Sequence, residues 1–175
     1  EIAGVLFEQN QYKSCLDYYQ EAARIMSRLD KTQDAFTVYE RVGICHLRLE
    51  KYQDAMRAFK EAQHLFSTTP GNIDDRQVGR AVLSYYIGRA YEGLKQPEDA
   101  LTSYLDTIGA FGLIQNTTSG DKATLAATMY RTGCLLTNKS SEVDRAAKML
   151  ENALEIRRAV LGSHDVEIAD TLYQL

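Results

Sequence analysis

One pattern of small and apolar residues recurs along the sequence at intervals of about 40 residues, and this recurrence constrains the fold more than any other feature. The stretch YKSCLDYYQEA (12–22) returns as YQDAMRAFKEA (52–62). A small residue is followed four positions later by a large apolar or aromatic one, and this spacing places both on one face of a helix. The small position holds Cys15, Ala55, Ala100 and Ala146, and the large position holds Tyr19, Phe59, Tyr104 and Leu150. The pattern predicts a series of similar helical units.

A second series of apolar stretches alternates with the first and carries a glycine at the same register in three units. These glycines are Gly43, Gly88 and Gly133. A glycine inside a helix costs about 1 kcal/mol relative to alanine, so three of them at one register need a physical reason. We expect a partner helix to pack so closely at each glycine that no side chain fits.

The alternation of a glycine-bearing helix with an alanine-and-aromatic helix resembles the tetratricopeptide repeat family, whose pattern is W-x-x-L-G-x-x-Y followed by A-x-x-x-F and A. The sequence departs from that pattern because it has no Trp and a period of about 40 to 46 residues instead of the usual 34. The longer period is typical of long-helix members, and the last unit is similar to kinesin light chain repeats. The resemblance is carried by Tyr39, Val42, Gly43, His46, Ala55, Phe59 and Ala62, then Ile87, Gly88, Tyr91, Ala100 and Tyr104, then Met129, Gly133, Leu136, Ala146, Leu150 and Ala153.

The resemblance implies an all-α fold: a right-handed α-α superhelix, or solenoid, of about four antiparallel helix-pair repeats in one domain, 1–175. Repeat units are expected at 1–30, 31–70, 74–112 and 121–161, with a further unit starting at 165–175. Helices are expected at 1–9, 12–29, 31–49, 52–67, 74–94, 97–111, 121–137, 142–161 and 165–175. Because the sequence begins and ends inside such units, we expect it to be a fragment of a longer chain or to carry incomplete end units.

Charge and hydropathy argue against nucleic acid and membrane as partners. The formal net charge is -4, which gives no broad basic field for phosphates or anionic lipids. No apolar run approaches the roughly 18 residues of a membrane span. The three cysteines lack C-x-x-C spacing, which favours reduced, mostly buried thiols in a cytoplasmic protein.

Catalysis finds little support, and neither a cofactor nor a metal site is expected. Cys45 and His46 are adjacent, but neighbours in a helix point about 100° apart, so they form a poor nucleophile and base. His46 occupies the aromatic packing position of the repeat and is expected to pack. The charged stretches RQVGR, EIRRAV and VDRAAK are expected to be solvated helix faces. An enzymatic module would need a convergent polar pocket that the sequence does not reveal.

The resemblance further implies that the first helix of each pair lines a concave surface open to a guest. Arginine can hold a carboxylate through two hydrogen bonds, and tyrosine buries area at low entropic cost, so the candidate groove suits a protein or peptide segment with acidic and aromatic side chains. The candidate groove residues are Glu40, Ile44, Arg48, Tyr85, Arg89, Tyr130, Arg131 and Cys134. The Lys and Asn clamp of chaperone-binding members is not expected, because Glu40, Ile44 and Tyr85 stand at those positions.

Two other interpretations stay open. The groove residues could be ordinary exposed or inter-repeat contacts. Alternatively, the repeats could act as a structural spacer or a self-association module, because Ile2, Leu6, Leu172 and Leu175 lie at the ends of the sequence and could pair copies end to end.

Overall fold

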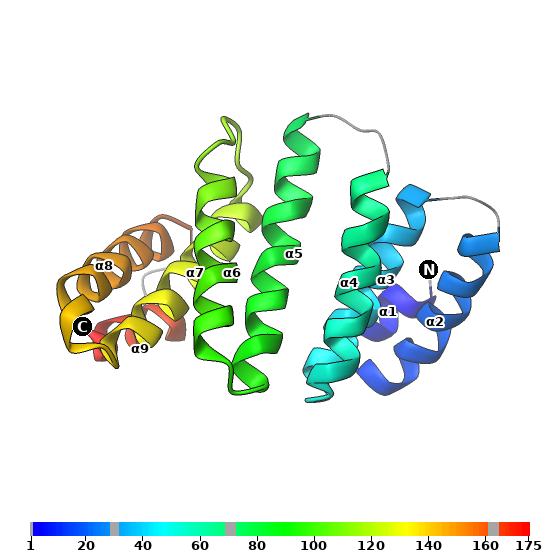
Figure 1. The fold of residues 1–175 in the computed structure, drawn as a ribbon, viewed down its shortest axis with the longest axis horizontal. Coiled ribbons are helices and arrows are strands. Elements are labelled where there is room, and N and C mark those ends of the chain that lie inside the picture. Colours follow the sequence, from blue (N-terminus) through cyan, green and yellow to red (C-terminus); the bar gives the residue numbers. More distant parts are fainter. Residues whose placement is uncertain (1, 29–31, 69–72, 161–164) are drawn as a thin grey trace. The chain divides into compact units, whose positions relative to one another are not determined.

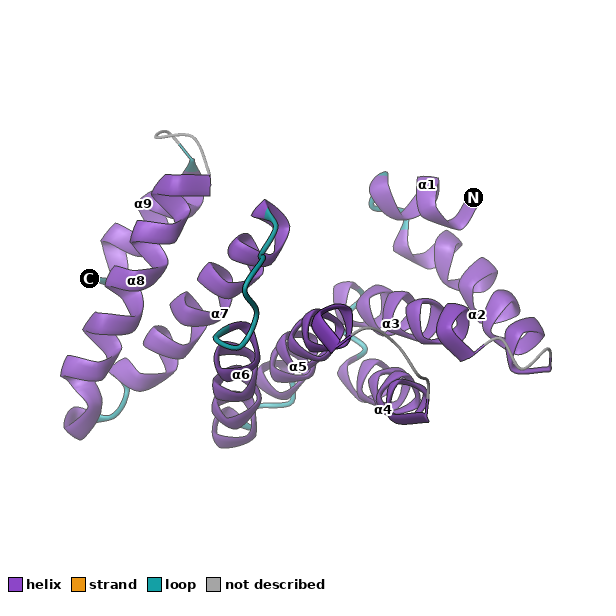
Figure 2. Cartoon of the chain, turned by 90° about the horizontal axis from the view of Figure 1, so that it is seen from above, coloured by secondary structure: helices purple, strands orange, loops and turns teal. Residues whose placement is uncertain are grey.

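The computed structural model describes residues 2–28, 32–68, 73–160 and 165–175. All regular secondary structure in these ranges is helical, as Figures 1 and 2 show. The α-helices are α1 (Ile2–Glu8), α2 (Tyr12–Arg28), α3 (Thr32–Arg48), α4 (Tyr52–Thr68), α5 (Ile73–Gly93), α6 (Pro97–Phe111), α7 (Ser119–Thr137), α8 (Val143–Val160) and α9 (Val166–Gln174), with a 3-10 turn, η1 (Ser140–Glu142), before α8.

The predicted all-α class is confirmed, and each predicted helix is present. The helix ends expected at 1, 29, 31 and 161 lie outside the described residues, and the other ends differ by at most two residues from the expected ones. The largest shift is at α7, which begins at Ser119 instead of 121. Its start is moved by a capping box: Thr118 Oγ1 accepts from the Asp121 N–H at 3.2 Å, and the Asp121 carboxylate accepts from the Thr118 N–H at 2.8 Å. Together these bonds satisfy backbone donors that a helix start leaves open.

The chain divides into two compact units. Unit 1 consists of Glu1–Arg76 and Arg89–Gln96, and unit 2 consists of Gln77–Gly88 and Pro97–Leu175. Unit 1 therefore contains α1 to α4 with the two ends of α5, and unit 2 contains the middle of α5 with α6 to α9. Within each unit, helices that are consecutive in the sequence pack on one another.

Three first-to-second helix turns share one backbone conformation. Asn10, Glu50 and Lys95 have φ values of 58°, 57° and 60°. In each turn the next residue's N–H reaches back to a carbonyl five positions earlier; for example, the Gln96 N–H donates to the Tyr91 carbonyl at 2.9 Å. This left-handed helix ending leaves three residues between the first helix and the second and sets the short antiparallel connection.

The repeat glycines pack as the sequence predicts, each against the large residue of its partner helix. A Cβ atom added to Gly43 would lie 2.3 Å from the Phe59 ring, and one added to Gly88 would lie 2.5 Å from the Tyr104 ring. At Gly133 the nearest Leu150 atom would be 2.7 Å away. The small-residue positions Cys15, Ala55, Ala100 and Ala146 are also at most 1% exposed. Both repeat series therefore form the interfaces inside the helix pairs.

Candidate functional site

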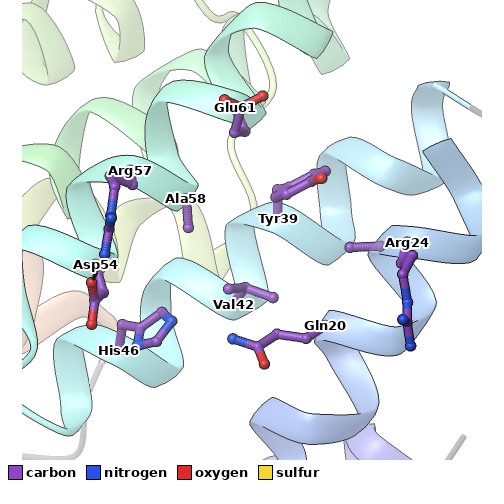
Figure 3. A pocket seen from close by; sticks show the side chains of 10 residues that line it. Gln20, Arg24, Tyr39, Val42, His46, Asp54, Arg57, Ala58 and Glu61 are labelled. Atoms are coloured by element: carbon purple, nitrogen blue, oxygen red, sulfur yellow. Dashed lines mark hydrogen bonds and ion pairs between the residues drawn. The ribbon is translucent and has the colours of Figure 1, made fainter.

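Unit 1 contains a pocket of about 570 Å³ between α2 and α4, with α3 beneath it (Figure 3). Its lining comes from these three helices alone, so all of it lies inside one compact unit. The lining residues are Gln20, Ala23 and Arg24 from α2, Tyr39, Val42 and His46 from α3, and Asp54, Arg57, Ala58 and Glu61 from α4.

The floor of the pocket is apolar and its rim is charged. Ala23, Val42 and Ala58 are between 4% and 7% exposed and form part of the core of unit 1. On the rim, Arg24 of α2 pairs with Glu21, and Arg57 of α4 pairs with Asp54. Such exposed ion pairs within one helix contribute little stability, so both guanidinium groups can exchange partners at low cost. The pocket can thus accept an apolar side chain flanked by polar or charged groups.

His46 is the most buried polar residue of the lining. It is 8% exposed, and its buried Nδ1 atom has no hydrogen-bond partner among the residues that the structure describes. Burial lowers the pKa of His46, and the nearby Asp54 carboxylate opposes this only in part. Burial also raises the pKa of the adjacent Cys45 thiol, which stays protonated at neutral pH. A neutral imidazole beside an unionised thiol is a poor base and nucleophile pair.

The candidate groove residues of unit 1 follow successive turns of α3 but differ widely in exposure. Ile44 is only 3% exposed. Glu40 is half-buried, and desolvation raises the pKa of its carboxyl while Arg41 works in the opposite direction. Arg48 is exposed near the end of α3. Glu40 and Arg48 therefore offer charge to a guest, whereas Ile44 contributes packing.

Arg89 lies on the end of α5 that belongs to unit 1. It is half-buried and forms an ion pair with Glu92 one turn away, at 3.9 Å. The candidate groove residues are thus divided between the two units, and a groove continuous along the whole chain stays a prediction.

The candidate groove residues of unit 2 are Tyr85, Tyr130, Arg131 and Cys134, and aromatic contacts hold Tyr85 in place. Tyr85 is 9% exposed, and its ring lies 5.1 Å from that of Tyr86 and 6.1 Å from that of Tyr104. Tyr130 on α7 is half-buried, and burial, with the Cys134 side chain one turn away, raises the pKa of its hydroxyl. Arg131 and Cys134 are also half-buried. Of this set, Tyr130, Arg131 and Cys134 share one helix and are partly open to solvent.

Arg157 of α8 corrects the expectation that the stretch EIRRAV is a solvated face. It is 5% exposed, whereas its neighbour Arg158 is exposed as expected. Its guanidinium donates to the Glu167 carbonyl at 2.8 Å and to Thr171 Oγ1 at 2.5 Å, and it lies 4.6 Å from the centre of the Tyr130 ring. Arg157 therefore joins α7, α8 and α9.

The sequence carried a signal for this burial. Arg157 follows Leu150 by seven positions, so it lies on the same face of α8 as the repeat packing residues. The pocket of unit 1 has no comparable signal, because it arises from the spacing between α2 and α4.

Within the described ranges, no group of three or more His, Cys, Asp or Glu side chains is arranged to hold a metal ion. No helix in these ranges is both long and apolar enough to cross a membrane.

Paired helices that pack in sequence order define an α-solenoid. Two family models, both described as tetratricopeptide repeat, match residues 1–66 and 125–167. Together the two matches span more than half of the sequence, and the chain belongs to the tetratricopeptide repeat family.

Solved structures share this fold. BtubC (BKLC) from P. vanneervenii superimposes with a TM-score of 0.76 at 19% identity, over 99% of this chain and 67% of that one. The nearly identical TPR-like repeats of a putative kinesin light chain from Podosopora anserina give a TM-score of 0.66 at 14% identity, over 100% of this chain and 81% of that one. No curated protein matches the sequence. At these identities the likeness establishes a common fold.

Proposed function

We propose that the chain is a non-catalytic scaffold whose first helices bind an extended segment of another protein. Tetratricopeptide repeats are generally protein-interaction scaffolds, and stacked helix pairs present extended surfaces suited to this task. The absence of a reactive pair at His46 and Cys45 agrees with a binding role, because both groups are neutral at physiological pH. A cytoplasmic location stays a prediction.

The observation that carries the proposal is a set of tyrosines on the first helices of unit 2. Tyr85 of α5 and Tyr130 of α7 each precede a repeat glycine by three positions, and Tyr173 lies on α9. Tyr85 is nearly inaccessible at 9% exposed, so the half-buried Tyr130 and the 88% exposed Tyr173 are the rings open to a partner. Aromatic side chains are frequent anchors of protein interfaces, so Tyr130 and Tyr173 are the candidate anchors.

Arg131 supplies the charge that sets the partner's chemistry. It follows Tyr130 directly on α7 and is half-buried. A guanidinium in a partly desolvated position binds a carboxylate more strongly than an exposed one does. The preferred partner is therefore a peptide that combines Asp or Glu with an aromatic or apolar residue.

A peptide array tests this assignment. The intact chain is applied to peptides that combine acidic and aromatic residues and to matched peptides with Ser in place of each acid. Tyr173→Ala and Arg131→Glu are expected to weaken retention on the acidic peptides at least about tenfold, while Arg158→Glu, on the second helix of the pair, changes it little. Equal loss in all three variants, or none in Arg131→Glu, refutes the assignment.

The pocket of unit 1 adds a second possible anchor for the same partner. Its apolar floor suits one aliphatic or aromatic side chain. Ala58→Trp is expected to fill the pocket and weaken binding without affecting the tyrosines of unit 2. Unchanged binding by this variant limits the peptide site to unit 2.

The alternative is a structural spacer or self-association module, and exposed apolar residues on the terminal helices favour it. Ile2 and Val5 of α1 are 62% and 57% exposed, and Val166 and Leu172 of α9 are 71% and 49% exposed. Light scattering over a concentration series separates the two functions. A dimer or larger species that forms without a peptide and is abolished by Leu172→Glu supports self-association, and a monomer at all concentrations excludes it.

A further inference from the structure

Two cysteines from neighbouring helices meet in the core of unit 1. Cys15 of α2 and Cys45 of α3 are both 0% exposed, and their Sγ atoms are 3.1 Å apart. They belong to one apolar cluster that also contains Leu16, Val38 and Val42. Two thiols this close form at most one weak hydrogen bond, yet their sulfurs already point at each other.

The packing position does not itself require sulfur. The positions that correspond to Cys15 in the next three repeats are Ala55, Ala100 and Ala146. The position of Cys45 holds Ala90 in the third repeat and Leu135 in the fourth. All four alanines are at most 1% exposed, so alanine fills these positions in a packed interface. The paired cysteines therefore add a chemistry that the repeat does not need for its fold.

We propose that Cys15 and Cys45 are an oxidisable pair that forms a disulfide between α2 and α3 when a peroxide reaches unit 1. A disulfide bond is about 2.05 Å long, so the sulfurs must approach by about 1 Å, a movement within the range of side-chain rotation. The link closes a loop that runs from α2 through its connection to α3.

The oxidation occurs in two balanced steps. The thiolate of one cysteine attacks a peroxide oxygen, the O–O bond breaks, and a sulfenic acid and one water form from hydrogen peroxide. The second thiol, as its thiolate, then attacks the sulfenic sulfur, the S–O bond breaks, and the disulfide forms as a second water leaves. Overall the two thiols lose two protons and two electrons, and the peroxide gains them to become two waters.

Access to the pair depends on α1. Burial raises the pKa of Cys45, so in the closed structure the thiol reacts slowly. The side chains that pack against the cluster from α1 are Leu6 and Phe7, and both are only partly buried. Contacts made by partly buried side chains open at a lower free-energy cost than those of the fully buried core. Opening of α1 would admit peroxide and solvent to the sulfurs.

The disulfide would act on the pocket of unit 1. Cys45 directly precedes His46 in the pocket lining, and Cys15 is on the helix that supplies Gln20 and Arg24 to it. A covalent link between α2 and α3 fixes the spacing of two of the three helices that form the pocket. Oxidation would therefore couple a peroxide signal to the shape of that surface.

Mass spectrometry of the intact chain tests the pair. Reduced protein is treated with hydrogen peroxide, remaining thiols are blocked with iodoacetamide, and the digest is searched for linked peptides. Wild type and Cys134→Ser are expected to lose two hydrogens and yield a peptide that joins Cys15 to Cys45. Cys15→Ala introduces the alanine that the other three repeats have, and Cys45→Ala introduces the alanine that the third repeat has as Ala90. Both variants are expected to fold normally and to yield no such link. A product that requires Cys134 overturns the proposal.

Two further arms separate geometry from access. In the first arm, unfolded and reduced wild type is refolded in oxidised glutathione, so that both cysteines are exposed to the oxidant before the core closes. If Cys15 and Cys45 are still free thiols in the refolded chain, the proposed geometry is overturned. In the folded protein, Phe7→Ala is expected to speed peroxide oxidation of the pair several-fold. An unchanged rate overturns the proposed route through α1.

Discussion

Replacement of Gly88 by alanine sets two known effects against each other. Alanine in place of glycine inside a helix gains about 1 kcal/mol of intrinsic propensity. The new Cβ, however, would lie 2.5 Å and 2.7 Å from two ring atoms of Tyr104. Tyr104 is 0% exposed, so its ring cannot swing into solvent. Overpacking of a rigid core costs typically about 1 to 3 kcal/mol, and contacts this short place the cost at the upper end. We expect a net loss of about 2 kcal/mol in the free energy of unfolding.

Urea unfolding followed by circular dichroism measures this change, and Gly109→Ala is a matched control in the partner helix. A Cβ added to Gly109 meets no atom within 4 Å, so this variant should keep the propensity gain and become up to about 1 kcal/mol more stable. In a Tyr104→Ala background, where the ring is absent, Gly88→Ala should also become favourable. Two results would refute the reasoning: equal stabilisation by Gly88→Ala and Gly109→Ala, or a loss at Gly88 that persists without the Tyr104 ring.

Three further variants test local interactions. Arg157→Met removes charged hydrogen bonds to α9 and should lower the free energy of unfolding by about 2 to 3 kcal/mol. Limited proteolysis should then cut α9 faster than in the wild type. The control Arg158→Met should have little effect on either measurement. Burial lowers the pKa of His46 in the folded state, so the unfolded state binds more protons as pH falls through the ordinary pKa of histidine, about 6.5. The free energy of unfolding should therefore fall as pH drops through this range. His46→Tyr should reduce that pH dependence in urea titrations at several pH values. Lys95→Gly should stabilise the chain by about 0.5 to 1 kcal/mol, because glycine adopts the left-handed conformation of this turn without strain. The control Gln96→Gly should not stabilise the chain. A lower urea midpoint for Lys95→Gly would contradict this.

The helices and their pairing were predictable because their signals are local and repeated. Spacings of three and four residues define a buried face within one helix, and the recurrence of Gly88 and Tyr104 at matching positions in other units indicates that the two faces meet. The structure confirms both features. The start of α7 was the least accurate boundary, because its capping box involves Thr118 and Asp121, which lie outside the repeat pattern.

The exposure of individual groove residues was less predictable. Register places Ile44 and Tyr85 on the same stripe as Glu40 and Tyr130, yet Ile44 and Tyr85 are nearly inaccessible. The exposure of a side chain depends on which neighbouring helices pack over it. The spacing of residues along one helix contains no information about those neighbours. For the same reason the charged stretch EIRRAV was predicted to face solvent, whereas its Arg157 packs beneath α9.

The sequence by itself determined the helical repeat, its family and the glycine contacts inside each pair, because each of these follows from residue spacing along one or two adjacent helices. Only the tertiary structure decided that Cys15 and Cys45 touch, that Arg157 joins three helices and that a pocket opens between α2 and α4. These features depend on distances between segments that are far apart in sequence, and such distances are set by the packing of whole helices.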